Sequence, residues 1–174
     1  AASLVLMDDD LMHMVDAVAF GRRIYENLKK AIQYIISIHI PLILTATLPL
    51  LFFWKYTSIF SPVHVIFLEL IMGPTCSIVF ENEPIEASSM QKVPRKMSTS
   101  FFSIRELSLS IIQGLIITLA CLNLGYYFMI QNASEAQVRT IIYTTLIFSN
   151  LFLTLANRSF YYSVLTTLQY KNKL

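Results

Sequence analysis

The chain has 174 residues and a formal net charge of only +2, so its overall charge says little about partners. Hydrophobic residues make up 55% of it, and its mean hydropathy is +0.59. These residues are gathered in four long runs, not spread at the amphipathic spacing of a soluble core, which excludes a soluble enzyme. We therefore expect an all-α membrane protein, a bundle of four transmembrane helices that contacts the lipid bilayer and no nucleic acid.

One long helix is expected over residues 11–54, because apolar residues first recur at helical spacing and then become continuous. Its part at residues 19–30 would be a cytoplasmic stalk, and residues 31–54 would form the first membrane span. That span has about 24 residues, enough to cross a bilayer core of roughly 30 Å with some tilt. Pro41 and Pro49 lie inside it, and each removes a backbone hydrogen bond and favours a kink.

Polar residues accompany this helix at its start and along the stalk. Asp9 or Asp10 can cap the start of the helix. We prefer this interpretation to a metal site formed by the acidic run at residues 8–10. The basic residues of the stalk are expected to anchor the helix at the membrane interface. They are Arg22, Arg23, Lys29 and Lys30.

Three further spans are expected at residues 62–80, 107–130 and 138–156. Residues 157–174 are expected to form a polar cytoplasmic tail. If the N-terminus is cytoplasmic, four spans return the C-terminus to the cytoplasm. All thirteen Lys and Arg residues except Lys55 and Arg139 then lie on the cytoplasmic side. This distribution satisfies the positive-inside rule and predicts the orientation of the chain.

The second span carries a carboxylate at a depth where charges are rare. Glu69 lies near the middle of this span, where an acid costs about 2.5–3.5 kcal/mol even on insertion scales. Pro74 has no N–H to offer the Leu70 carbonyl, and Gly73 makes local unwinding easier. A buried carboxylate beside an unpaired carbonyl is typical of cation sites at the midplane of transporters. The alternative is a Pro-kinked helix whose Glu faces a buried polar partner.

Two runs of the sequence resemble the P-type cation-transporting ATPases, in a bacterial branch near the calcium-pump type. One is the stalk run Gly-Arg-Arg-Ile-Tyr-Glu-Asn-Leu-Lys-Lys-Ala-Ile-Gln-Tyr at residues 21–34. The other runs from Pro62 through Phe-Leu-Glu-Leu-Ile at residues 67–71 to Glu-Asn-Glu-Pro at residues 81–84. The resemblance covers nearly the whole chain. It implies that residues 1–18 are the C-terminal remnant of the phosphorylation domain and that the four spans are membrane helices five to eight.

The resemblance implies a C-terminal piece of such a pump, cut before its last two helices. The family's phosphorylated Asp-Lys-Thr-Gly-Thr motif, its Thr-Gly-Glu loop and its Gly-Asp-Gly-x-Asn-Asp motif do not occur in this sequence. We therefore expect no ATP hydrolysis by this chain alone and no catalytic or cofactor-binding residue in it. ATP and Mg²⁺ would act in the remainder of the pump, its phosphorylation, nucleotide and actuator domains, in a bacterial plasma membrane.

The ion site departs from the pattern of the calcium pumps. Positions that carry ligands in that pattern match His39, Leu42, Glu69, Met72, Gly73 and Ile147 here. Glu69 is the only carboxylate among them, whereas Ca²⁺ prefers six to eight oxygens that include several carboxylates. The transported cation is therefore left open, and a proton or a monovalent cation suits the site as well.

Under this hypothesis Glu69 is the main ligand of the transported cation. The secondary candidates are the Leu70 carbonyl, Thr75, His39 and Asn150. A lone His is more often structural than a ligand, although the mid-span depth of His39 favours a functional role. A second hypothesis is a standalone four-helix membrane protein, or a truncated product, with a structural or regulatory role. An open reading frame that continues upstream through a phosphorylation motif would exclude the second hypothesis.

Overall fold

The computed structural model describes residues 10–86, 88–94 and 101–159, and within these ranges the regular structure is helical. The long helices are α1 (Met12–Leu51), α2 (Pro62–Thr75), α3 (Ile104–Ile130) and α4 (Glu135–Ala156). A π-helical turn, η1 (Cys76–Phe80), extends α2, and the 3₁₀ turn η2 (Ser89–Gln91) lies in the next loop. In the described residues, four helical segments are long and apolar enough to cross a membrane, which confirms the expected fold class.

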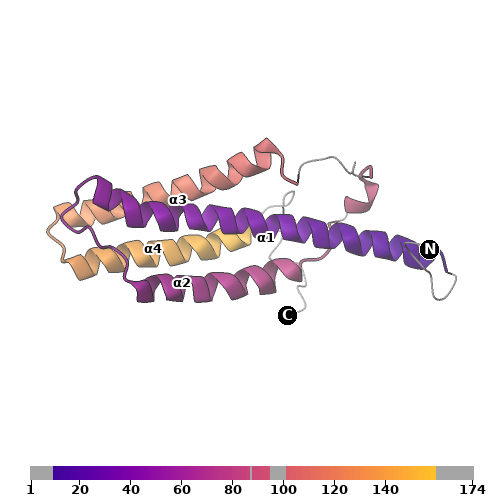
Figure 1. The fold of residues 1–174 in the computed structure, drawn as a ribbon, viewed down its shortest axis with the longest axis horizontal. Helices are drawn as coiled ribbons and strands as arrows, with labels where there is room; N and C mark the ends of the chain where they lie inside the picture. The colour runs from indigo at the N-terminus through magenta and orange to yellow at the C-terminus, as the bar shows by residue number, and fades with distance from the viewer. Residues whose placement is uncertain (1–9, 87, 95–100, 160–174) are drawn as a thin grey trace.

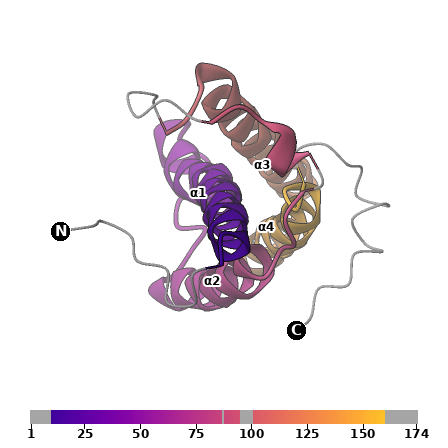
Figure 2. The same ribbon diagram turned by 90° about the vertical axis from the view of Figure 1, so that its right-hand side faces the viewer.

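The four long helices run side by side, and the N-terminal part of α1 extends beyond the other three (Figure 1). The end-on view shows α1 beside α3, with α4 and α2 completing the bundle (Figure 2). The α1–α2 and α3–α4 loops lie together at the end away from the extended part of α1 (Figure 1). The N-terminal part of α1 and the loop after α2 therefore share one end of the molecule.

The long first helix is continuous, as the sequence indicated, although it ends at Leu51 and not at Trp54. Phe53 takes a left-handed backbone conformation with φ of 51°, and the Trp54 N–H turns back to the Pro49 carbonyl at 2.9 Å. At the start, the Asp10 carboxylate accepts a hydrogen bond from the Met12 N–H at 2.9 Å. Asp9 and the acidic residue before it, like the tail after residue 159, lie outside the described residues.

Helices α3 and α4 each begin about three residues before the spans expected from hydropathy. Ser103 and Glu106 form a reciprocal capping box at the start of α3, and Ser134 and Gln137 form another at the start of α4. Each box satisfies two backbone N–H groups that the first helical turn leaves without partners. The polar first turns are therefore helical even though their composition does not mark them as membrane segments.

Helices α1 and α3 approach closely where Pro41 removes a hydrogen bond from α1. A Cβ atom at Gly114 would lie 2.8 Å from the Ile40 Cβ and 2.9 Å from the Ser37 carbonyl oxygen. That carbonyl is the one that Pro41, with no N–H, leaves without its usual helical donor. Glycine at position 114 is therefore required for the backbones of the two helices to meet here.

Candidate cation site

A groove of about 570 Å³ lies between α1 and α2, and Glu69 lines it. Its walls are largely apolar. They are formed by the face of α1 from Ile24 to His39 and by the face of α2 that carries Glu69, Met72 and Gly73. These three α2 residues share one face because they are three and four positions apart in a helix. The groove therefore presents the Glu69 carboxylate and the His39 imidazole from neighbouring helices within a largely apolar surface, which Glu81 also lines.

The side chains of His39 and Glu69 meet across this groove. The His39 Nε2 lies 3.4 Å from the Glu69 Oε1, and the two side chains keep 39% and 49% of their surface exposed. The other ring nitrogen, Nδ1, lies 2.8 Å from the Ile35 carbonyl oxygen one turn earlier in α1. The polar partner of Glu69 is thus His39, in a position that still allows access from the groove.

Leu70 and Thr75 do not line the groove. The Leu70 side chain is 65% exposed on another face of α2, and the Thr75 hydroxyl donates to the Ile71 carbonyl at 2.7 Å. The local unwinding that Gly73 was expected to favour does not occur, because α2 remains helical through Thr75. The backbone hydrogen bonds change to the wider π-helical pattern only afterwards, in η1. This turn follows the one in which Pro74 provides no N–H.

Asn150 lies behind the wall of the groove and not beside Glu69. Only 4% of this residue is exposed, and its Nδ2 donates to the Met72 sulfur at 3.5 Å. Its Oδ1 is buried without a hydrogen-bond partner among the described residues. Of the residues expected to hold a cation, the structure thus brings together the side chains of Glu69 and His39, whereas Thr75 and Asn150 do not line the groove and the role of the Leu70 carbonyl stays a prediction.

The described part of the chain contains no group of three or more His, Cys, Asp or Glu side chains that could hold a metal ion. The pair of Glu69 and His39 would therefore hold a cation together with ligands from elsewhere, such as water or other parts of a larger protein. The mouth of the groove is open to such ligands because both side chains remain partly exposed.

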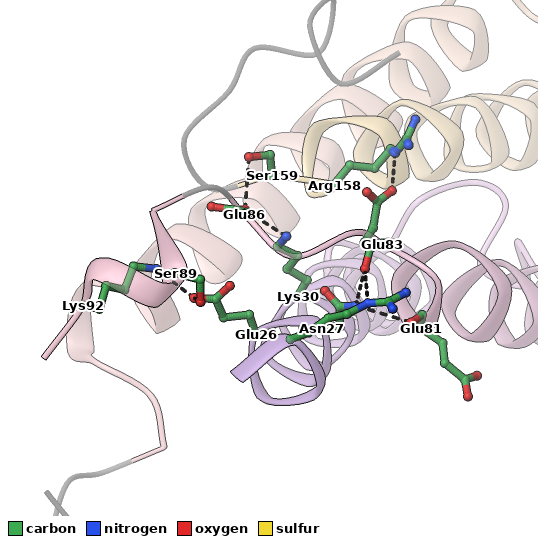
Figure 3. Close-up of polar contacts among 11 residues, drawn as sticks. Glu26, Asn27, Lys30, Glu81, Glu83, Glu86, Ser89, Lys92, Arg158 and Ser159 are labelled. Carbon is green, nitrogen blue, oxygen red and sulfur yellow. Dashed lines mark hydrogen bonds and ion pairs between the residues drawn. The ribbon is translucent and has the colours of Figure 1, made fainter. Parts of the chain in front are cut away.

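A second polar region, which the sequence analysis did not find, joins the stalk to the loop after α2 and to the end of α4 (Figure 3). Lys30 is 1% exposed and its Nζ lies 2.9 Å from the Glu86 Oε1. Arg158, after α4, pairs with the Glu83 carboxylate, which is 1% exposed. Two buried carboxylates of one loop therefore hold two buried cations from different helical segments.

The same loop accepts hydrogen bonds through its backbone. Arg23 donates to the Glu83 carbonyl at 2.8 Å, and the Asn27 amide donates to the same carbonyl at 2.9 Å. Arg22 donates to the carbonyls of Ser89 and Lys92 at 2.6 and 2.8 Å. The stalk thus ties down the loop along several of its residues.

The interpretation of the stalk charges as simple interfacial anchors is wrong for Lys30, whose buried ammonium is paired inside the protein. Lys29 is also paired, because its Nζ lies 2.7 Å from the Glu106 carboxylate at the start of α3. The acids that follow the second span, Glu83 and Glu86, were the available signal, since two successive spans would return this loop to the side of the stalk. Only the tertiary structure shows which cation each acid meets.

Comparison with known proteins places these features in a family. The sequence profile described as "Cation transporting ATPase, C-terminus" matches residues 57–174. Calcium-transporting ATPase 1 of Lactococcus lactis is 29% identical over 91% of this chain and 18% of its own length. A calcium-transporting ATPase of Listeria monocytogenes is 28% identical over the same shares, and one of Bacillus cereus is 33% identical over 59% of this chain and 11% of its own. The chain spans less than a fifth of the length of these relatives.

Proposed function

The chain belongs to the cation-transporting ATPase family, as the membrane-embedded C-terminal part, and we propose that it forms the ion-translocation path of an ATP-driven pump. The observation that carries this proposal is the pair of Glu69 and His39 between α1 and α2. Ionisable side chains near the middle of apolar helices are costly and mark ion pathways. The cation would bind at this pair, with further ligands from the remainder of the pump.

Coupling to ATP would run through α1. This helix is continuous over 40 residues, from a part that extends beyond the bundle to the turn that carries His39. ATP chemistry with Mg²⁺ in the phosphorylation, nucleotide and actuator domains of the pump would displace α1 and thereby move His39 relative to Glu69 on α2. Such a movement changes transport only if the cation binds the two arrangements with different affinity.

The proposal includes an orientation in a bacterial plasma membrane, with both ends of this chain in the cytoplasm. The basic stalk and the loop that it holds lie at one end of the bundle, as Figure 1 shows. Lys55 and Arg139 belong to the opposite end, where Arg139 donates to the Ile59 carbonyl of the α1–α2 loop at 2.9 Å. This distribution of charges supports a cytoplasmic position of the stalk end.

The test is ion-stimulated ATP hydrolysis by the complete pump in liposomes, with Glu69→Gln as the variant. We expect Glu69→Gln to abolish stimulation by the transported ion, because an amide lacks the charge that attracts the cation. Glu135→Gln is the matched control, since Glu135 is a carboxylate outside the groove that pairs with Arg139 on the surface of the first turn of α4. Stimulation that survives in Glu69→Gln, with the protein folded and the control unchanged, would remove Glu69 from the transport path.

A further inference from the structure

We propose that His39 and Glu69 select a divalent transition-metal ion of the zinc class as the transported cation, in preference to Ca²⁺. This inference rests on the proposed function and names the chemical class of its cargo. It depends on the orientation of one imidazole ring, on the distance between two atoms and on the types of donor that the groove presents.

The position of the His39 proton follows from its neighbours. The Ile35 carbonyl oxygen, 2.8 Å from Nδ1, can only accept a hydrogen bond, so Nδ1 carries the proton of the neutral ring. The lone pair of Nε2 then faces the Glu69 carboxylate, which also can only accept. In the neutral ring with this tautomer the two acceptor atoms lie 3.4 Å apart, an arrangement that a cation between them would stabilise by coordination.

The arrangement of the imidazole is that of a metal ligand. Histidines that bind metals donate their second ring N–H to a carbonyl or carboxylate, which holds the ring in place and makes the free nitrogen more basic. His39 does so through the Ile35 carbonyl, within the same helix. Because α1 also provides this carbonyl, the orientation of the ring does not depend on any other part of the pump.

The distance between the two donor atoms is compatible with their binding one ion. Ligands at 2.0–2.1 Å from a tetrahedral zinc ion lie about 3.3–3.4 Å from each other. The separation of Nε2 and Oε1, 3.4 Å, agrees with this value. Several ions could accept such a spacing, so the choice among them depends on the donor types.

The donor types favour an ion softer than Ca²⁺. Calcium takes six to eight oxygen ligands, and imidazole nitrogen suits zinc, copper, iron and nickel. At the pair itself the groove offers the imidazole nitrogen of His39 and the carboxylate of Glu69, and the other α2 residues of its wall, Met72 and Gly73, carry no side-chain oxygen. A mixed site of this kind binds zinc-class ions with few ligands, and water or other helices of the pump can fill the remaining positions.

The experiment uses the complete pump with Zn²⁺ and Ca²⁺ as competing probes and Co²⁺ as a coloured substitute for Zn²⁺. We expect ATP hydrolysis to respond to Zn²⁺ at lower concentration than to Ca²⁺. His39→Asn should raise the half-saturating Zn²⁺ concentration at least about tenfold and leave that of Ca²⁺ the same or lower. Independently of activity, Co²⁺ should give a visible absorption band with the parent pump that His39→Asn removes.

The matched control is His64→Asn. His64 lies at the start of α2, where its Nδ1 contacts the Ser61 hydroxyl at 2.6 Å, away from the groove. This variant should retain the Zn²⁺ response and the Co²⁺ band of the parent pump. Loss of both in His64→Asn as well would show that they do not report on His39 and would overturn the inference.

Three results separate the inference from the proposed function. If Ca²⁺ or a monovalent ion stimulates the pump through Glu69 and His39→Asn changes nothing, the inference is wrong and the proposed function stands. If only a change of pH affects activity, the pair binds a proton and the inference is wrong. If no ion stimulates the pump and Glu69→Gln has no effect, the inference and the proposed function are both wrong, even if Co²⁺ binds.

Discussion

At the scale of single residues, buried charges stand out in a chain that is mostly apolar. Lys30, Glu83, Glu86 and Arg158 are all less than 9% exposed, and they form two ion pairs. Transfer of such charges from water is costly, and pairing offsets this cost only while both partners are present. The two pairs therefore add less to net stability than to the definite arrangement of the stalk, the loop after α2 and the end of α4.

Removal of Arg158 alone should destabilise the pump. In Arg158→Met the buried Glu83 carboxylate loses its cation, and breaking a buried pair in this way costs about 3–5 kcal/mol. The midpoint of thermal unfolding in detergent should fall accordingly. The double variant Arg158→Met with Glu83→Leu should recover much of the loss, because no unpaired charge remains. A double variant as unstable as the single one would contradict this account.

At the scale of elements, the contact between α1 and α3 depends on the absence of a side chain at Gly114. The nearest atoms to a Cβ there are the Ser37 carbonyl oxygen and the Ile40 Cβ, at 2.9 and 2.8 Å. Neither is the flexible end of a side chain, so the helices themselves would have to separate. At Gly125 the nearest atom is the Ile142 Cδ1, the end of a side chain that can rotate away.

Gly114→Ala should therefore destabilise the bundle, by about 1–3 kcal/mol as for other overpacked positions. Gly21→Ala is the matched control, because a Cβ at Gly21 meets nothing within 4 Å and alanine favours a helix. The midpoint of thermal unfolding should fall in Gly114→Ala and stay unchanged or rise in Gly21→Ala. Equal midpoints would show that α1 and α3 have room to adjust.

At the scale of the whole molecule, the two ends of the bundle differ in charge and in construction. At one end a basic stalk holds the loop after α2. At the other, the α1–α2 loop is held by Arg139 and by the Tyr56 hydroxyl, which donates to the Ala133 carbonyl at 3.0 Å. The orientation proposed above assigns the first end to the cytoplasm.

Cysteine labelling tests this orientation. In a cysteine-free background of the complete pump, Lys55→Cys should react in intact cells with a thiol reagent that does not cross membranes. Val93 lies in the loop after α2 and is 86% exposed. Val93→Cys should therefore react only after the cells are permeabilised. The opposite pattern would reverse the topology, and labelling of both in intact cells would exclude a single orientation.

The sequence by itself determined the all-helical fold class, the number of long apolar helices and the continuity of α1, because these follow from local periodicity and from the length of apolar runs. It also pointed to Glu69 and His39, since an ionisable group within an apolar run is conspicuous without a structure. The polar starts of α3 and α4 lie before the spans expected from hydropathy, because hydropathy does not register a capping box.

Only the tertiary structure decided which side chains meet. Thr75 and Asn150 looked like neighbours of Glu69 in sequence or in depth, but Thr75 does not line the groove, and Met72 stands between Asn150 and the groove. The pairing of Lys30 with Glu86 joins residues 56 positions apart, and that of Arg158 with Glu83 joins residues 75 apart. Such partners depend on how helices rotate and pack against one another, and that rotation is set by contacts such as the one at Gly114, not by local composition.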